Sequence, residues 1–192
     1  VDEALGGRNG LNILHLKEPL ADTAPSLGMT AEVLAGAFRA IREALFARRE
    51  LRPRPHRDDK VLADWNGLMI AALARAGRIM GDARSVEAAV NAARFILDTM
   101  RSENGRLFHR YREGERAFSG MLDDYAFLAW GLLELYESTF EESYLAHALE
   151  LADTLIARFR DPESGGFFVT ADDAEQVLAR RMDFYDGAIP SG

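Results

Sequence analysis

The stretch Asp58–Gly81, DDKVLADWNGLMIAALARAGRIMG, decides the fold. Its apolar residues recur at every third or fourth position, which predicts an amphipathic helix. The expected buried stripe consists of Leu62, Trp65, Met69, Leu73 or Ala72, Ala76 and Met80. Alanine fills much of the remainder, and it both favours the helix and lets a neighbouring helix approach closely. Gly81 is expected to end the helix.

The first turn of this helix contains two residues that helix propensity does not explain. Asn66 and Gly67 are both poor helix formers. A core position gains nothing from an amide, so Asn66 is a candidate for a binding role. Gly67 either belongs to the same site or permits close packing of a second helix.

The same spacing predicts four further helices. They begin at Thr30, at Asp82 or Ser85, at Asp123 or Asp124, and after Phe140. Their expected buried stripes are Leu34, Phe38, Ile41 and Leu45; Ala89, Ala93, Ile96 and Met100; Tyr125, Leu128, Leu132 and Tyr136; and Leu145, Leu149, Ala152, Ile156 and Phe159. Pro53 and Pro162 lie beyond the ends of the first and last of these helices. Strand-like aromatic segments are expected at 107–111 and 167–169.

The pattern of helix, turn, helix and strand-like segment occurs twice. The unit that starts at Asp64 recurs at Asp123 after a shift of about 58 to 60 residues, and a third copy begins near Asp186. A helical hairpin cannot bury its apolar face alone, so the copies are expected to stack. The period is longer than that of most open solenoids, which favours a closed ring. We therefore predict an all-α fold of helical hairpin repeats, a partial (α/α)6 toroid over residues 28–192, preceded by an irregular segment over residues 1–27.

Composition excludes several classes of function. The net charge is −8, which argues against binding to nucleic acid or to an anionic membrane surface. No apolar run reaches the roughly 20 residues that cross a bilayer. There is no cysteine, which excludes disulfides and thiol chemistry within the chain and is compatible with the cytoplasm. The N-terminus resembles neither a signal peptide nor an initiator start, so we expect the chain to begin within a longer protein.

Four motifs together resemble one family. They are DDKVLADWNGLMI at 58–70, LDDYAFLAWGLLELYE at 122–137, FRDPESGGFF at 159–168 and DGAIPSG at 186–192. In this order they are similar to the YyaL-like proteins, which include the spermatogenesis-associated thioredoxin-like proteins. The resemblance implies a thioredoxin-like domain upstream, then a six-hairpin region similar to glycosidases and N-acylglucosamine epimerases. This chain would form about half of that ring, and the family has no settled reaction.

In a helical toroid the inner helices present their N-termini at one mouth, so the repeat is expected to bring equivalent first turns together. Carboxylates at such a mouth suit acid–base chemistry on a sugar, and aromatic or amide groups suit sugar binding. The candidate catalytic residues are Asp124 and Asp186, followed by Asp64 and Asp123. The candidate substrate-binding residues are Trp65, Asn66, Tyr125 and His109.

Each of these candidates has a structural alternative. An aspartate at a helix start is most often an N-cap, and a tryptophan or tyrosine on a helix is most often a core residue. Asp186 lies among turn-forming residues and is equally consistent with an ordinary loop. None of the four histidines has a metal-binding spacing, so neither a metal nor another cofactor is expected.

Two functions follow from these alternatives. One is a glycosidase-like or epimerase-like region that binds or processes a carbohydrate. The other is a non-catalytic helical module that scaffolds the thioredoxin-like domain or binds a protein. In either case half a ring leaves apolar helix faces uncovered, so we expect the chain to self-associate.

Overall fold

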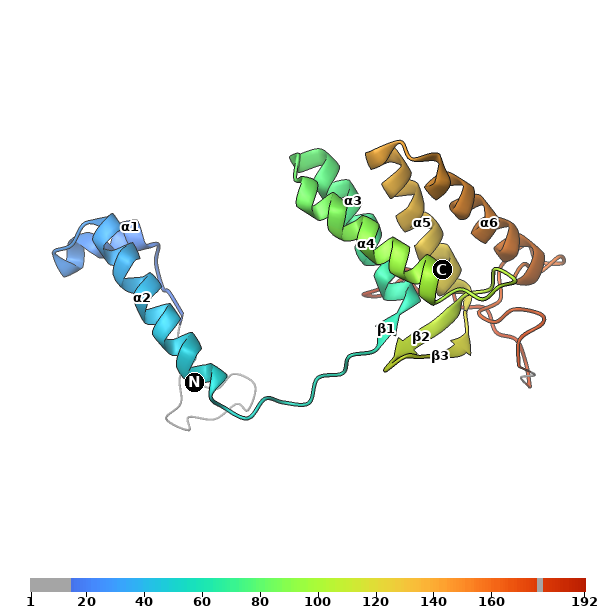
Figure 1. The fold of residues 1–192 in the computed structure, drawn as a ribbon, viewed down its shortest axis with the longest axis horizontal. Coiled ribbons are helices and arrows are strands. Elements are labelled where there is room, and N and C mark those ends of the chain that lie inside the picture. The colour runs from blue at the N-terminus through green and yellow to red at the C-terminus, as the bar shows by residue number, and fades with distance from the viewer. Residues whose placement is uncertain (1–14, 176–177) are drawn as a thin grey trace. The chain divides into compact units, whose positions relative to one another are not determined.

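The computed structural model describes residues 15–175 and 178–192. The chain forms two compact units, Val1–Arg57 and Asp58–Gly192 (Figure 1). The boundary differs from the expected one at residue 28. Part of the segment expected to be irregular also forms short helical turns, α1 (Leu20–Thr23) and η1 (Ala24–Leu27).

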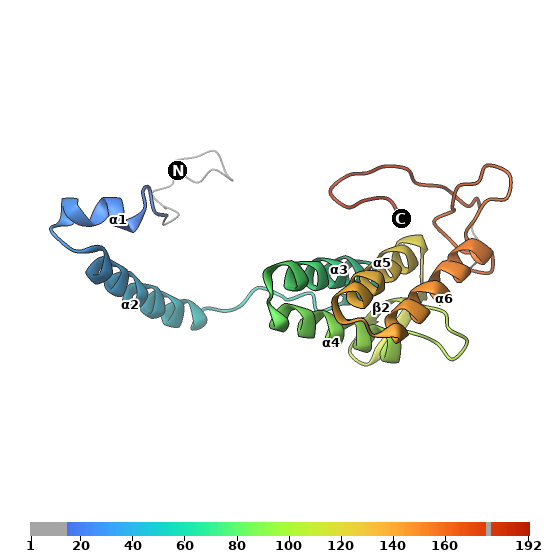
Figure 2. The same cartoon turned by 90° about the horizontal axis from the view of Figure 1, so that it is seen from above.

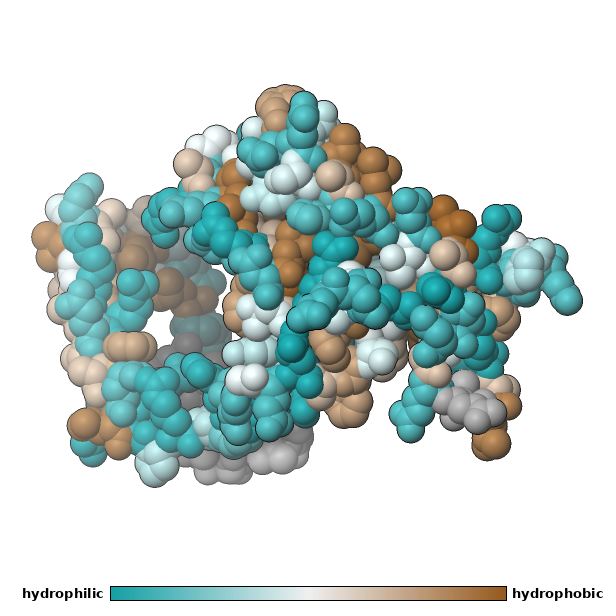
Figure 3. Space-filling model, turned by 45° about the vertical axis from the view of Figure 1, so that its right-hand side comes forward, coloured by the Kyte–Doolittle hydropathy of each residue, from teal (hydrophilic) through white to brown (hydrophobic). Residues whose placement is uncertain are grey.

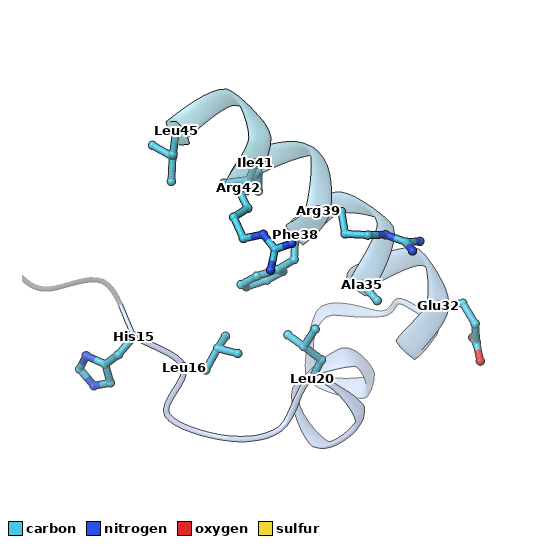
Figure 4. Close-up of a pocket in the computed structure, with 10 residues that line it drawn as sticks. All are labelled: His15, Leu16, Leu20, Glu32, Ala35, Phe38, Arg39, Ile41, Arg42 and Leu45. Carbon is cyan, nitrogen blue, oxygen red and sulfur yellow. The ribbon is translucent and has the colours of Figure 1, made fainter. Parts of the chain in front are cut away.

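The first unit contains one long helix, α2 (Ala31–Glu50). Thr30 caps it as predicted, because the Thr30 hydroxyl accepts a hydrogen bond of 3.3 Å from the amide of Val33. The predicted buried stripe is largely wrong: only Leu34 is buried. The other three stripe residues, Phe38, Ile41 and Leu45, are exposed and line a hollow with Leu16 and Leu20 (Figure 4).

The second unit contains two helical hairpins, α3 (Ala63–Met80) with α4 (Ala83–Thr99) and α5 (Leu122–Thr139) with α6 (Glu142–Arg158). Each helix of the second hairpin begins 59 residues after its counterpart in the first, as the repeat predicted. Gly81 ends α3 in the left-handed region at φ 67°. Asp82 caps α4 by accepting a hydrogen bond of 3.1 Å from the amide of Arg84.

The helices α3 and α5 pack side by side and run parallel, with α4 and α6 beside them (Figures 1 and 2). The two helices meet at Gly67, where a Cβ atom would lie only 2.5 Å from the main chain of Phe127 and Leu128. Further along, a Cβ atom at Gly131 would lie 2.8 Å from the carbonyl oxygen of Gly67. Arg78 in the last turn of α3 forms an ion pair of 2.7 Å with Glu137 in the last turn of α5. Glycine is therefore required at both crossing points, which confirms close packing as a reason for Gly67.

This close contact reverses the predicted orientation of α3. The buried residues of the helix are small except for one, namely Ala63, Gly67, Ile70, Ala71, Ala74 and Gly77. Trp65, Met69 and Met80, which were expected in the core, are more than half exposed. Because α3 packs closely against both α4 and α5, the face with the small residues is the one that fits between them.

A three-stranded antiparallel sheet lies at one end of the hairpins. Its order is β1 (Val61–Leu62), β2 (Phe108–Arg112) and β3 (Glu115–Ser119). The two-residue turn Glu113–Gly114 has positive φ at both positions, as a tight hairpin of this hand requires. The strand predicted at 107–111 is therefore confirmed as β2. The segment expected at 167–169 forms only an isolated bridge between Phe167 and Arg160, the counterpart of the bridge between Leu107 and Arg101.

The core of the second unit lies between the two hairpins. The predicted stripe of α4 is fully buried, and so are Tyr125, Leu128 and Leu132 on α5. On α6 the prediction is partly wrong, because Leu149 and Ile156 are exposed. Apolar residues also reach the surface, where they form brown areas between hydrophilic ones (Figure 3). None of the helices in the described ranges has the length and apolarity that crossing a bilayer requires.

Candidate functional site

Asp124, in the first turn of α5, is a carboxylate with no exposed surface. Its Oδ2 atom accepts a hydrogen bond of 2.8 Å from the amide of Met121, just before α5. Its Oδ1 atom accepts one of 3.0 Å from the amide of Asp64, in the first turn of α3. A buried charge is stable only with such partners. Asp124 therefore ties the starts of α3 and α5 together, and these are the first turns that the repeat predicted to meet.

His109 reaches the same carboxylate from the sheet. Its Nδ1 atom lies 3.0 Å from Oδ1 and 3.1 Å from Oδ2 of Asp124. The side chain of His109 is 23% exposed, whereas that of Asp124 is 0% exposed. The hydrogen bond to Asp124 is the main cause that raises the pKa of His109 above its ordinary value, and burial partly opposes it. The ring is thus held between a buried anion and solvent.

Asp64 supplies a second, half-buried carboxyl group. Its Oδ1 atom accepts a hydrogen bond of 2.7 Å from the amide of Trp65. Burial raises the pKa of Asp64, and the negative charge of Asp124 raises it further. One ligand atom from each of Asp64, His109 and Asp124 falls within 4.8 Å of the others, a spacing that could hold a metal ion. Both oxygen atoms of Asp124 already accept hydrogen bonds, so a metal ion would have to compete with them.

Asp123 adds a third carboxyl group beside these. Burial raises its pKa most, and the charges of Asp64 and Asp124 add to this effect. The C-terminal residue Gly192 lies against the Asp123 carboxylate, and a hydrogen bond from its main chain acts in the opposite direction. The segment that contains the expected third copy therefore returns to the start of α5.

Trp65 and Asn66 lie next to this cluster in the chain but behave differently. The Trp65 side chain is 57% exposed, so its indole is available to a ligand. The side-chain amide of Asn66 donates a hydrogen bond of 2.8 Å to the carbonyl oxygen of Leu62, four residues earlier. Asn66 therefore also has a local structural role, which its position in the sequence did not indicate.

Tyr125 belongs to the core, which corrects its prediction as a substrate-binding residue. It is fully buried, and its ring packs against Phe159 with a centroid distance of 5.2 Å. Its hydroxyl oxygen accepts hydrogen bonds of 3.0 Å from the amide of Leu107 and 3.1 Å from Nε of Arg106. The phenol thus secures the segment that leads into β2, and β2 carries His109.

Asp186 does not join the cluster through any hydrogen bond or ion pair of the described residues. Its side chain is exposed, and its Oδ1 atom accepts a hydrogen bond of 2.8 Å from the amide of Ser191. This is the loop-stabilising contact that the structural alternative expected. The structure thus brings Asp64, Asp123, Asp124 and His109 together. Asp186 lies in a turn a few residues before Gly192.

Comparison with known proteins identifies the relatives of this chain. No family model matches it. It is 36% identical to human spermatogenesis-associated protein 20 over 196 aligned positions, which cover 97% of this chain and 25% of that protein. It is 31% identical to the uncharacterized protein B0495.5 of Caenorhabditis elegans over 169 positions, which cover 84% of this chain and 23% of that protein. The chain therefore spans about a quarter of the length of these relatives.

Solved structures show the same fold. Cellobiose 2-epimerase from Bacillus thermoamylovorans matches 72% of this chain and 36% of its own, with a TM-score of 0.59 and 17% identity. A GH76 alpha-mannanase from Bacteroides thetaiotaomicron matches 61% of this chain and 33% of its own, with a TM-score of 0.53 and 13% identity. These likenesses confirm a partial (α/α)6 toroid. The chain belongs to the family of spermatogenesis-associated protein 20, and it corresponds to a helical segment with a glycosidase-like fold.

Proposed function

We propose that this chain contributes to a site that binds or processes a carbohydrate at the joined first turns of α3 and α5. The observation that carries the proposal is the cluster of three carboxyl groups and one imidazole there. The fold supports it, because matching structures include an epimerase and a mannanase that act on sugars. Fold similarity alone does not fix a function, so the residues of the cluster must bear the argument.

Asp64 and Asp123 are the carboxyl groups that suit acid–base work on a ligand. Both are half-buried, and both have a raised pKa because of burial and the neighbouring carboxylates. Close carboxyl groups of this kind repel each other when ionised, so one retains its proton at a higher pH than the other. Cleavage of a glycosidic bond uses such a pair, one group as an acid and the other as a base or nucleophile.

Asp124 has a different role from the one first expected. It is fully buried, so its oxygen atoms have no surface to offer to a substrate. Its hydrogen bonds to two main-chain amides and to His109 instead fix the positions of the groups around it. We therefore assign Asp124 to support of the site rather than to contact with the sugar.

Trp65 provides a surface for the sugar ring. An exposed indole can stack against the apolar face of a pyranose, while carboxylates accept hydrogen bonds from the hydroxyl groups. Trp65 directly follows Asp64 at the start of α3 and is more than half exposed. The proposed site thus combines an aromatic platform with acidic groups on one pair of helix starts.

One observation favours the alternative, a non-catalytic helical module. The bonds that Asp124 accepts from the amides of Met121 and Asp64 are also what a purely structural helix cap makes. In that case the cluster stabilises the joint between hairpins, and the module binds a protein or supports a thioredoxin-like domain. The alternative predicts no affinity for sugars.

Binding experiments on the full-length protein decide between the two functions. Thermal unfolding is measured with a panel of mono- and disaccharides, because a ligand of the native state raises the melting temperature. We expect a sugar to raise it in the wild type and in Asp153→Asn, a matched change at an exposed residue of α6. The increase should be lost in Asp64→Asn and in Trp65→Ala. No increase with any sugar would refute the proposal and favour the module.

A further inference from the structure

We propose that His109 is the proton-transferring residue of this site and that Asp124 is the positioning residue that fixes its tautomer. The inference rests on the proposed carbohydrate site and assigns the roles within it. Its basis is the juxtaposition of a partly exposed imidazole with a fully buried carboxylate that is anchored on two helices.

The contact between the two residues determines which ring nitrogen carries the proton. Nδ1 of His109 lies at nearly equal distances, 3.0 and 3.1 Å, from the two oxygen atoms of Asp124. Those oxygen atoms are acceptors, and main-chain amides already donate to each of them. Nδ1 must therefore be the donor, and in the neutral ring Nε2 carries the lone pair.

Nε2 is the nitrogen left for a substrate. It has no hydrogen-bond partner among residues 15–175 and 178–192. The Nδ1 edge faces a carboxylate with no exposed surface, while the side chain as a whole retains 23% of its exposure. A ligand that reaches the ring from solvent therefore meets the basic nitrogen.

The orientation of the ring comes from the sheet and the repeat together. Alternate residues of a strand point to opposite faces, so β2 directs Phe108 and Arg110 away from the side that His109 occupies. β2 pairs with β1, which leads directly into α3 and Asp64. Three separate elements, α3, β2 and α5, thus converge on one imidazole.

The proton transfer that this arrangement supports needs no co-reactant, because every proton and electron pair is accounted for by the sugar and His109. One proton leaves an O–H or C–H group of the sugar for Nε2, and the electron pair of the broken bond stays on the sugar. The Nδ1 proton remains between the ring and Asp124, whose negative charge stabilises the imidazolium. The reverse step returns the proton from Nε2, so the same residue serves as base and then as acid.

Three charged groups act on the ring from the elements around it. Asp124 on α5 and Asp64 on α3 favour the imidazolium, and Arg110 on β2 opposes it. Removal of the Asp124 charge must therefore lower the pKa of His109 towards its ordinary value. An asparagine at position 124 can face Nδ1 with its carbonyl oxygen as an acceptor or with its NH2 group as a donor, so the ring can change tautomer.

NMR of the full protein labelled with ¹⁵N in histidine tests the roles directly. In the wild type we expect the Nδ1–H tautomer at His109 and a raised pKa. In Asp124→Asn the pKa should fall and the tautomer should become mixed. Glu150→Gln is the control, because Glu150 contacts His147 and not His109, and it should leave the His109 signals unchanged.

Each outcome separates this inference from the proposed function. An Nε2–H tautomer in the folded wild type overturns the inference, even if Asp124→Asn does not fold. So does a His109 pKa that is the same in the wild type and in a folded Asp124→Asn variant. The NMR measurements need no sugar, so the expected tautomer without any sugar binding would refute the proposed function and leave only the positioning of the His109 ring by Asp124 in place.

Discussion

Replacement of Gly67 by alanine tests the close contact that places the site. In an isolated helix the change favours folding by about 1 kcal/mol. Here the new Cβ atom would lie 2.5 Å from main-chain atoms of Phe127 and Leu128, where ordinary contact begins at 3.4 Å. Main-chain atoms cannot rotate away as a side chain can. The two helices must therefore separate by roughly 1 Å. We expect the energetic cost of this separation to be about 3 kcal/mol, the upper end of the range for overpacking.

The net effect is a loss of about 2 kcal/mol, since the helix propensity offsets about 1 kcal/mol of the packing cost. For a unit of this size that loss lowers the melting temperature by roughly 6 °C. Circular dichroism during heating measures it. Hydrogen exchange should also be faster at the Asp64 amide, because separation of the helices weakens its bond to Asp124.

Two matched variants isolate the packing cost. Gly36→Ala in α2 makes the same change where a Cβ atom meets nothing within 4 Å, so it should not destabilise. Ala72→Gly on the exposed side of α3 should cost about 1 kcal/mol through propensity alone. If Gly67→Ala is as harmless as Gly36→Ala, the helices do not meet as closely as the structure shows, and the reasoning fails.

Three further predictions concern the surroundings of the site. Tyr125→Phe should lower the free energy of unfolding by about 1–3 kcal/mol, because the buried amide of Leu107 loses its acceptor; a change below 0.5 kcal/mol in urea denaturation would contradict this. His109 has a raised pKa, so its pairing with Asp124 stabilises the fold fully below about pH 6.5, and this contribution is lost as pH rises through the folded pKa. The stability advantage of the wild type over His109→Gln should therefore shrink between pH 6 and pH 9, and a constant difference would exclude this linkage. The chain should self-associate through the exposed apolar residues of α3 and α5, and sedimentation that shows a monomer at all concentrations would contradict it.

The helices and the repeat could be predicted because local signals determine them. Thr30 and Asp82 cap helices where expected, and Gly81 ends α3. The stripe of α4 was also correct, since its apolar residues face one packed side. β3 gave no such signal, because only Ala117 among its residues is even partly buried, so its sequence shows no apolar alternation.

The orientation of α3 could not be predicted from hydrophobicity. The spacing of large apolar residues predicted Trp65 and Met69 to be buried, whereas small residues that allow close contact form the buried face of the helix. The repeat did predict that the first turns with Asp64 and Asp124 would meet. It could not predict that His109 pairs with Asp124, because that contact depends on the register of β2 in a sheet whose other strands were not foreseen.

Asp124 is hydrogen-bonded to the starts of both α3 and α5, and these bonds determine what a substitution at position 124 would change first. A single side chain holds both helix starts and the imidazole, so a substitution there perturbs the junction of the two helices together with the chemistry. In cells such variants would show reduced protein abundance before any change in activity could be measured. Natural diversification of the site is therefore expected at its exposed members, such as Trp65, while position 124 stays fixed.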